Sequence, residues 1–293
     1  MLSILIPTYN YEVYELVKVL NKQALDAKIE FEIIVLDDGS QKFQTENKKI
    51  NKFQFCTYEI LKVNIGRSAI RNLLAKKAAF ENLLFLDSDT IPIDTNFISN
   101  YLLQITNEEK IVSGGILYPE LKPKESQSLR WKYGNSREAL SAKVRNESPY
   151  LRLLTLNFMI QKSVFEKVSF NEKIPNLRHE DTLFSYNLKQ QNIRVEHFEN
   201  PVYHNGLDDF EVAIKKENES LIALKYLIEN QLIPYDYISL SKLFYDLKKM
   251  QLEFLLKVFY KTTEPLLLKN LASKNPSLFI FDMYRLGYFG SLH

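Results

Sequence analysis

An acidic pair in the sequence has the residue types and spacing of a cation site. Residues 87–89 (DSD) directly follow an apolar run at residues 83–86. Side chains two residues apart on an extended chain point the same way, so both carboxylates would lie together at the end of a strand. Like charges held together need a cation, and oxygen ligands favour magnesium, manganese or calcium. Such an ion could bridge to a diphosphate, although an isolated Asp-x-Asp is more often a solvated acidic turn.

Two more polar clusters follow apolar runs in the same manner, which favours a site over a solvated turn. Residues 7–10 (PTYN) follow the run at 2–6, and residues 37–40 (DDGS) follow the run at 31–36. Helical spacing of apolar residues, as in residues 13–20, separates these runs. Continuous apolar strands separated by helices predict a largely parallel α/β sheet covered on both faces. Ligands of such sheets bind at the carboxyl ends of the strands, where all three clusters would lie.

The remaining elements follow from the same periodicities. We expect strands near residues 58–63, 83–86, 153–160, 194–197 and 202–204, and helices near residues 67–80, 163–168 and 179–190. Residues 118–150 hold three prolines and the only tryptophan, Trp131, and interrupt this rhythm. They predict a long loop of the lid or binding-loop kind. Trp131 would either stack on an acceptor sugar or pack that loop.

Helices dominate after Gly206, which predicts a catalytic domain of residues 1–205 and a C-terminal helical extension of residues 206–293. Asp208 and Glu211 have the spacing of a capping box at the first of these helices. Apolar residues then form a stripe at helical spacing from residue 240 to residue 258.

Composition excludes several classes of protein. The net charge of +2 is too close to neutral for broad nucleic-acid binding. The single cysteine, Cys56, excludes a disulfide framework within one chain. The N-terminus lacks the features of a signal peptide, and no apolar run reaches the roughly 18 residues of a membrane span, so we expect a cytoplasmic location. No Gly-x-Gly-x-x-Gly follows a strand, which argues against a dinucleotide-binding dehydrogenase.

Taken in order, these motifs resemble those of a family 2 glycosyltransferase with the GT-A fold. The matching segments are residues 3–10 (SILIPTYN), 32–40 (EIIVLDDGS), 64–66 (NIG), 71–72 (RN), 84–89 (LFLDSD) and 179–181 (HED). The resemblance covers roughly residues 2–205 and implies a Rossmann-like, mostly parallel sheet flanked by helices. It also implies a metal-dependent, inverting, hexosyltransferase-type transfer from a nucleotide-sugar, expected to be a UDP-sugar.

The resemblance implies a role for each matching residue. The nucleotide would be bound by side chains from all three strand ends and from the helix near residues 67–80, namely Pro7, Thr8, Tyr9, Asp37, Arg71 and Asp87. Within that set, Asp37 would contact a uracil ring. Asp89 would hold the manganese or magnesium ion, and His204 matches a histidine that supplies another metal ligand in some relatives.

The Glu180-Asp181 pair would supply the catalytic base, and the resemblance favours Asp181. Asp181 would take the proton from the acceptor hydroxyl as that hydroxyl attacks the anomeric carbon. Glu180 is the rival for this role, although a carboxylate at the start of a helix is also favoured by the helix dipole alone. The acceptor would be a glycan or a lipid-linked saccharide of surface glycan or polysaccharide biosynthesis.

The C-terminal helices raise a separate question of membrane contact. Residues 237–293 hold eight Lys or Arg against four Asp or Glu, a net charge of +4. Aromatic residues crowd their end, namely Phe279, Phe281, Tyr284, Tyr288 and Phe289. Basic and aromatic helices can lie on an anionic membrane, which here would be the inner face. Packing against the catalytic domain or a second subunit explains the same residues and is favoured, and a homo-oligomer stays open.

Two other functions fit part of this pattern. A nucleotidyltransferase also joins a metal ion to a nucleotide on an α/β sheet, but it would usually need a Gly-rich, basic loop after its first strand, where this chain has residues 7–10. A non-catalytic sugar-nucleotide-binding protein would not need both acidic motifs intact, as they are here.

Overall fold

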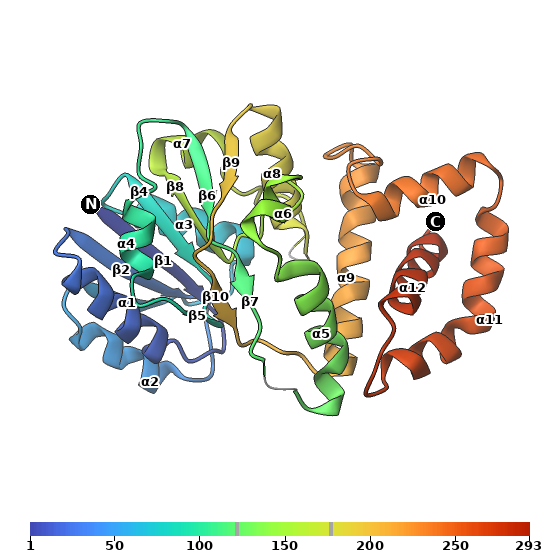
Figure 1. Cartoon of the computed structure of the whole chain (residues 1–293), viewed down its shortest axis with the longest axis horizontal. Coiled ribbons are helices and arrows are strands. Elements are labelled where there is room, and N and C mark those ends of the chain that lie inside the picture. Colours follow the sequence, from blue (N-terminus) through green and yellow to red (C-terminus); the bar gives the residue numbers. More distant parts are fainter. Residues whose placement is uncertain (121–122, 176–177) are drawn as a thin grey trace. The chain divides into compact units, whose positions relative to one another are not determined.

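The structure is a computed structural model that describes residues 1–120, 123–175 and 178–293 (Figure 1). It divides into two compact units, each discontinuous in sequence. The first, which we call the sheet unit, consists of Met1–Tyr118, Ala139–Asn176 and Glu180–Gly206. The second, the helical unit, consists of Pro119–Glu138, Leu177–His179 and Leu207–His293. The division into a catalytic domain of residues 1–205 and an extension of residues 206–293 stays a prediction.

A seven-stranded sheet with the order β3-β2-β1-β4-β8-β6-β9 forms the centre of the sheet unit. Its strands are β1 (Leu2–Thr8), β2 (Phe31–Asp37), β3 (Cys56–Ile60), β4 (Asn82–Leu86), β6 (Lys110–Ser113), β8 (Asn157–Gln161) and β9 (Arg194–His197). A small sheet beside it has the order β5-β10-β7, with strands β5 (Thr90–Pro92), β7 (Ile116–Leu117) and β10 (Val202–His204). The first four strands of the large sheet are parallel, whereas β8 is antiparallel to both of its neighbours. The predicted mostly parallel α/β sheet is therefore confirmed.

The strand register brings the predicted polar clusters to one edge of the sheet. Thr8, the last residue of β1, lies opposite Asp37, the last residue of β2. On the other side of β1, Leu5 lies opposite Phe85, so β4 ends at the same edge. Leu5 and its neighbours in β1 are fully buried because helices cover both faces of the sheet, as continuous apolar strands require.

Helices of the sheet unit are α1 (Tyr14–Asp26), α2 (Gln44–Asn47), α3 (Arg67–Lys77), α4 (Phe97–Leu102), α6 (Ala142–Asn146), α7 (Lys162–Val168) and α8 (Glu180–Gln190), with a short 3₁₀ turn η1 (Lys48–Lys52). Leu74 of α3, Phe165 of α7 and Phe184 of α8 pack in one core with Phe85 of β4. The Phe165 ring stacks on Phe85 at 5.4 Å between centroids. Burial of this aromatic core fixes α3 and α8, which carry candidate site residues, against the sheet.

The helical unit consists of α5 (Ser128–Tyr133), α9 (Phe210–Glu229), α10 (Ser239–Lys249), α11 (Glu253–Leu271) and α12 (Leu278–Ser291), with the turns η2 (Glu125–Gln127) and η3 (Gly134–Glu138). Leu129 of α5 joins Tyr260, Leu267 and Tyr284 in its core. Leu129 lies in the segment of residues 118–150 that was predicted as a lid or binding loop, so a residue of that segment supplies part of this core. Trp131 donates from Nε1 to the Pro119 carbonyl at 3.1 Å, which favours the loop-packing interpretation of this residue.

One expectation for the helical segment was wrong, and the other is met by two helices. The helix after Gly206 begins at Phe210 with Asp209 at its N-cap position and no side-chain cap, while the Asp208 carboxylate accepts from Lys216 at 2.5 Å. Asp208 thus forms an ion pair instead of a capping box. The apolar stripe of residues 240–258 is divided between α10 and α11, because Gln251 adopts a left-handed φ of 60° between them.

No helix in the described part of the chain is long and apolar enough to cross a membrane. The cytoplasmic location itself stays a prediction.

Candidate active site

The acidic pair lies at the end of β4, as its position after an apolar run predicted. Asp87 accepts a hydrogen bond at Oδ1 from Arg71 Nη2 of α3 at 2.8 Å. Burial raises the pKa of Asp87; the Arg71 guanidinium opposes this shift and the Asp89 carboxylate adds to it, so the net shift is upward. Asp87 and Asp89 thus repel each other electrostatically, which is the condition under which a cation is favoured between carboxylates.

Arg71 joins the end of β4 to the start of α8. Its Nη1 lies 3.5 Å from Glu180 Oε1, while Nη2 binds Asp87, and only 5% of the residue is exposed. Burial lowers the pKa of Arg71, but Asp87 and Glu180 more than offset this, so the net shift is upward. The Arg71 Nε is buried without a hydrogen-bond partner in the described structure. The guanidinium is therefore held by two carboxylates from different elements and is a fixed positive charge at this edge.

The predicted base, Asp181, lies in the first turn of α8. Its Oδ1 accepts from the Thr182 backbone N–H at 2.7 Å. The preceding residue, His179, has a left-handed φ of 68°, a conformation that few non-glycine residues adopt, although histidine, asparagine and aspartate adopt it more often than the others. His179 Nε2 lies 2.9 Å from Ser220 Oγ of α9, within the helical unit. A side-chain contact of His179 thus accompanies an unusual backbone conformation directly before the Glu180-Asp181 pair, the kind of local strain that is concentrated at functional sites.

The donor atoms at Asp89 and His204 fit a divalent cation. His204 lies on β10 of the small sheet, and its Nε2 is 3.2 Å from Asp89 Oδ2. His204 Nδ1 is buried and has no hydrogen-bond partner in the described structure. A Cβ at Gly206 would lie 2.2 Å from Asp89 Oδ2, so glycine leaves the space that this carboxylate occupies. Carboxylate oxygen and imidazole nitrogen both suit manganese, although the described residues contain no group of three or more protein ligands, so a bound ion would need further ligands from donor or water.

The ends of β1 and β2 form the other half of the edge. Asn10, with a φ of 52°, donates from its backbone N–H to Ser40 Oγ at 2.6 Å and accepts at Oδ1 from the backbone of Gln41 at 2.9 Å. The two turns are thus tied together beside Pro7 and Thr8. Tyr9, which lies between Thr8 and Asn10 in the sequence, is 53% exposed, so its ring is accessible to a ligand.

Asp37 has a different environment from the one that a direct base contact would need. It is fully buried; its Oδ1 accepts from the Ser40 backbone at 2.7 Å and its Oδ2 accepts from the Tyr58 hydroxyl at 2.5 Å. Burial, and then this hydrogen bond to Asp37, raise the pKa of Tyr58. A uracil contact of Asp37 therefore stays a prediction, whereas its support of the 37–40 turn is a direct observation.

Sequence reasoning missed two residues of this edge. Asp38 accepts from the backbone N–H groups of Ile65 at 2.7 Å and Gly66 at 3.0 Å, and so anchors the segment that precedes α3. Burial, and then the charge of the Asp89 carboxylate, raise the pKa of Tyr11, so its hydroxyl responds to the candidate metal ligand. The 37–40 motif contained Asp38, but spacing could not tell which aspartate faces which partner, and no pattern marked Tyr11.

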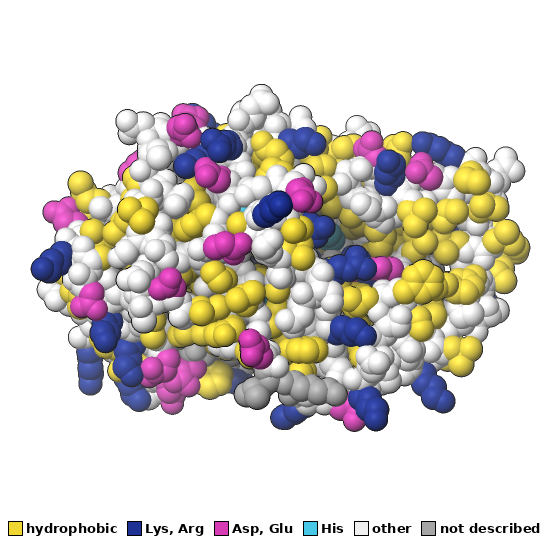
Figure 2. All heavy atoms as spheres, in the orientation of Figure 1, with side chains coloured by type: hydrophobic (Ala, Val, Ile, Leu, Met, Phe, Trp, Pro, Cys, Tyr) yellow, Lys and Arg dark blue, Asp and Glu magenta, His cyan; other side chains and the backbone are white. Residues whose placement is uncertain are grey.

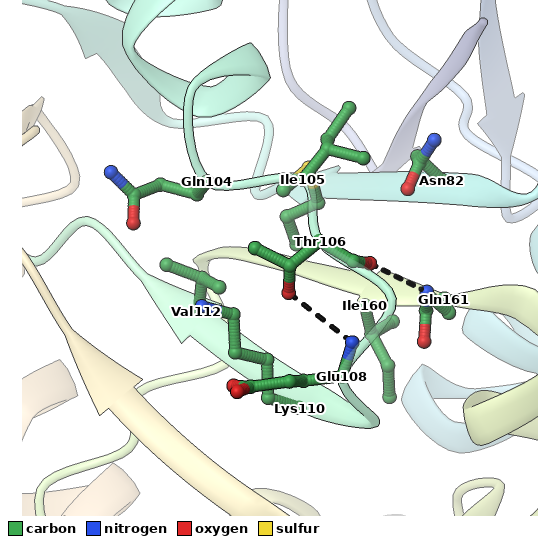
Figure 3. A pocket seen from close by; sticks show the side chains of 10 residues that line it. Asn82, Gln104, Ile105, Thr106, Glu108, Lys110, Val112, Ile160 and Gln161 are labelled. Carbon is green, nitrogen blue, oxygen red and sulfur yellow. Dashed lines mark hydrogen bonds between the residues drawn. The ribbon is translucent and has the colours of Figure 1, made fainter.

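A hollow at the opposite edge of the large sheet has another character (Figure 3). Its cavity volume is only about 10 Å³, and it is lined by Asn82, Lys110, Gln161 and their neighbours, where β4 and β6 begin and β8 ends. Gln161 Nε2 donates to the Thr106 carbonyl at 3.2 Å, and the Glu108 backbone donates to Thr106 Oγ1 at 3.3 Å. Its lining lacks the paired carboxylates of the other edge, so we assign it no part in the chemistry.

The model of the family described as Glycosyl transferase family 2 matches residues 3–169, more than half of the chain. An uncharacterized glycosyltransferase of Haemophilus influenzae is 27% identical over 192 residues, which are 63% of this chain and 70% of that protein. Poly(ribitol-phosphate) beta-N-acetylglucosaminyltransferase TarS of Staphylococcus aureus is 40% identical over 91 residues, 30% of this chain. That alignment spans 16% of the length of TarS.

Solved structures share the fold at low sequence identity. The crystal structure of TarS 1-349 in complex with UDP-GlcNAc aligns with 97% of this chain and 89% of that chain, at a TM-score of 0.54 and 17% identity. The mannosyltransferase PcManGT from Pyrobaculum calidifontis, in complex with GDP-Man and Mn²⁺, aligns with 78% of this chain and 64% of that chain, at a TM-score of 0.54 and 12% identity. These similarities support the predicted GT-A architecture with C-terminal helices.

Proposed function

The chain belongs to glycosyl transferase family 2, and we propose that it is an inverting, metal-dependent enzyme that transfers a hexose-type sugar from a UDP-sugar to an acceptor hydroxyl. The observation that carries this proposal is the Arg71 bridge between Asp87 at the end of β4 and Glu180 at the start of α8. Through this bridge, the buried Arg71 guanidinium contacts both the acidic pair that is proposed to meet the donor and the helix that is proposed to carry the base. Such preorganisation of charged groups is what transfer of a sugar between two bound substrates requires.

In the proposed reaction, Asp181 accepts the proton of the acceptor hydroxyl, and that oxygen forms a bond to the anomeric carbon. The bond between this carbon and the diphosphate oxygen breaks, and the nucleoside diphosphate leaves with the electron pair. Attack opposite the leaving group inverts the anomeric carbon, and no protein nucleophile is needed. Asp89 and His204 would hold the divalent ion, which when bound supplies a positive charge to the departing diphosphate.

The ion pair between Glu180 and Arg71 favours Asp181 as the base. A carboxylate that is 3.5 Å from a buried guanidinium would have to give up this interaction on taking a proton. Asp181 accepts from the Thr182 backbone N–H, at the N-terminus of α8. We therefore assign Glu180 to positioning, through Arg71, and Asp181 to proton transfer.

The choice of UDP is supported by TarS, whose structures include complexes with UDP and with UDP-GlcNAc. PcManGT was solved with GDP-Man and Mn²⁺, so a guanine nucleotide belongs in any screen of this chain. For the acceptor we propose a surface glycan or polysaccharide, including a lipid-linked saccharide. The intact acidic pair and the intact Glu180-Asp181 pair argue against a binding protein without activity. The lack of a Gly-rich, basic loop after β1 argues against a nucleotidyltransferase.

Thermal stabilisation by UDP, GDP and dTDP, each with and without manganese, tests the donor site. A ligand that binds only the folded chain raises the melting temperature by mass action. We expect a rise with UDP that needs manganese and is lost in Asp89→Ala. Absence of any rise at millimolar nucleotide would overturn the proposal, and binding without release of nucleoside diphosphate from any UDP-sugar would favour the non-catalytic alternative.

A further inference from the structure

Helix α11 is apolar on two sides, and the helical unit covers one of them. On the inner side, Tyr260, Leu267 and Leu271 pack in the core with α5 and α12. On the other side, four large apolar residues are exposed: Phe254 (69%), Leu255 (61%), Val258 (44%) and Leu266 (69%). Helices with apolar residues all round are normally buried on all sides. This exposed side therefore has the composition of a surface that is covered when the protein works.

The charges on this side are of one sign. Lys261 and Lys269 are exposed on α11 together with the four apolar residues, and we call these six residues the outer face of α11. At about 100° per residue they share an arc of roughly 140°. No Asp or Glu is among the exposed residues of α11. Neither lysine has an ion-pair partner among the described residues, so both charges are available to an external anion.

The two acidic residues of α11 are engaged elsewhere. Glu264 accepts from the Tyr260 hydroxyl at 2.7 Å, on the side of the core. Glu253, in the first turn, lies 3.8 Å from Lys248 of α10. The positive charge of the outer face is thus not neutralised from within its own helix. Figure 2 shows hydrophobic side chains gathered over the part of the surface where Figure 1 draws α11 and α12.

We propose that the outer face of α11 lies on the surface of an anionic lipid membrane. Large apolar side chains interspersed with lysines, without acids, match the boundary between acyl chains and anionic headgroups. Lysine stems can lie along the apolar region while their ammonium groups reach the headgroups. A second copy of the chain fits less well, because a two-fold contact makes a surface meet itself and would bring together two faces whose charged residues are all lysines.

This surface differs from the one that the aromatic sequence pattern suggested. Phe281, Tyr284 and Phe289 of α12 are buried within the helical unit, so packing explains them. Only Phe279 of the aromatic residues named from the sequence is highly exposed, at 72%. The sequence pattern raised membrane contact for residues 237–293 as a whole, and the proposal narrows it to α11.

Sedimentation with lipid vesicles tests the proposal on the full chain. The vesicles are phosphatidylcholine alone, or phosphatidylcholine with phosphatidylglycerol, each at low and high salt. We expect binding to the anionic vesicles only, weakened by salt because screening acts on exposed charges. The double variants Leu255→Ser/Leu266→Ser and Lys261→Glu/Lys269→Glu should each lower the bound-to-free ratio about tenfold or more.

The matched control carries one apolar and one basic substitution elsewhere on the surface. Leu103 is 80% exposed after α4 and Lys22 is exposed on α1, so Leu103→Ser/Lys22→Glu should bind vesicles like the unaltered chain. The proposal is overturned if anionic vesicles do not bind the chain, or if the outer-face variants bind them unchanged. It is also overturned if the unaltered chain is a dimer in solution by light scattering and Leu255→Ser/Leu266→Ser is a monomer, because the face would then belong to a second copy.

Discussion

The edge of the sheet unit and the outer face of α11 place side chains contrary to their polarity. At the edge, Arg71 is 5% exposed, although it carries a charge. On α11, Phe254 is 69% exposed, although it is among the most apolar residues of the chain. A charge can be buried when carboxylates surround it, and an apolar ring can remain in solvent when the molecule offers it no partner. The comparison indicates that burial here follows the available partners and not the polarity of the side chain alone.

The largest difference between the two regions should be in catalysis. Asp181→Asn is expected to lower kcat by about 10²–10⁴-fold, because the asparagine amide cannot accept the acceptor's proton. Leu255→Ser/Leu266→Ser on α11 should leave turnover of a soluble acceptor unchanged. Release of nucleoside diphosphate from a donor that the chain accepts measures both. Glu180→Gln is the informative companion: a larger loss there than in Asp181→Asn would reverse the assignment of the base.

Next in size is the loss of the buried guanidinium. Arg71→Met leaves Asp87 and Glu180 beside each other without a cation, and should lower the free energy of unfolding by about 3–5 kcal/mol. Urea unfolding followed by circular dichroism measures this. Arg194→Met is the matched control, since its guanidinium is exposed and lies 3.6 Å from Glu108, and it should cost less than about 1 kcal/mol. Equal losses of unfolding free energy in the two variants would show that the Arg71 bridge stabilises the fold no more than an exposed ion pair does.

A buried histidine of the sheet unit gives a pH dependence. His197 is 3% exposed, and burial lowers its pKa to about 4; its Nδ1 lies 3.1 Å from Arg145. The unfolded chain would take up this proton near pH 6.5, but the folded chain only near pH 4, so stability is lost as the pH falls between these values. The free energy of unfolding should fall by up to about 3 kcal/mol over this interval.

The variant His197→Gln isolates this contribution. Urea unfolding of both chains across the interval gives two slopes against pH, and the slope of the unaltered chain should be steeper by the amount that one proton contributes. Parallel slopes would mean that His197 is protonated at the same pH in the folded and unfolded states.

The smallest effect should separate two neighbours on α11. Leu266 is 69% exposed and Leu267 is 7% exposed. Leu266→Ser should change the free energy of unfolding by less than about 0.5 kcal/mol, as is usual for surface positions. Leu267→Ser should cost at least about 2 kcal/mol, because it removes a core side chain and buries a hydroxyl. Similar losses at both positions would mean that the outer face is covered in solution without any membrane.

The parts of the site that could be predicted from sequence are those in which a polar cluster directly follows an apolar run. β1, β2 and β4 are short apolar runs because both faces of the sheet are covered, and a polar cluster after such a run must lie at its carboxyl end. The Asp87–Asp89 pair, and the α/β class, follow from this rule. β9 and β10 also have the bounds that periodicity predicted.

What could not be predicted depends on pairing between distant segments. Nothing local links Arg71 to Glu180, because the contact exists only after α3 and α8 pack on the same sheet. β6 and β7 are two to four residues long and are paired by strands that come from other parts of the sequence. The stripe of residues 240–258 has helical spacing on both sides of Gln251. Its division into two helices is visible only in the structure, where Gln251 has a left-handed backbone conformation. Periodicity reports that a face is apolar, but not whether the rest of the chain covers it.

The discontinuous course of the helical unit has a consequence for how this protein could be inherited. Leu129 of α5 has its core partners in α11 and α12, well over a hundred residues further along the chain. A recombination event with one breakpoint near codon 206 would exchange α11 and α12 but leave α5 behind, and the new partners would meet a core residue selected for other neighbours. We therefore expect α5 and the C-terminal helices to change together among relatives, and the helical unit to be passed on with its sheet unit as one gene segment.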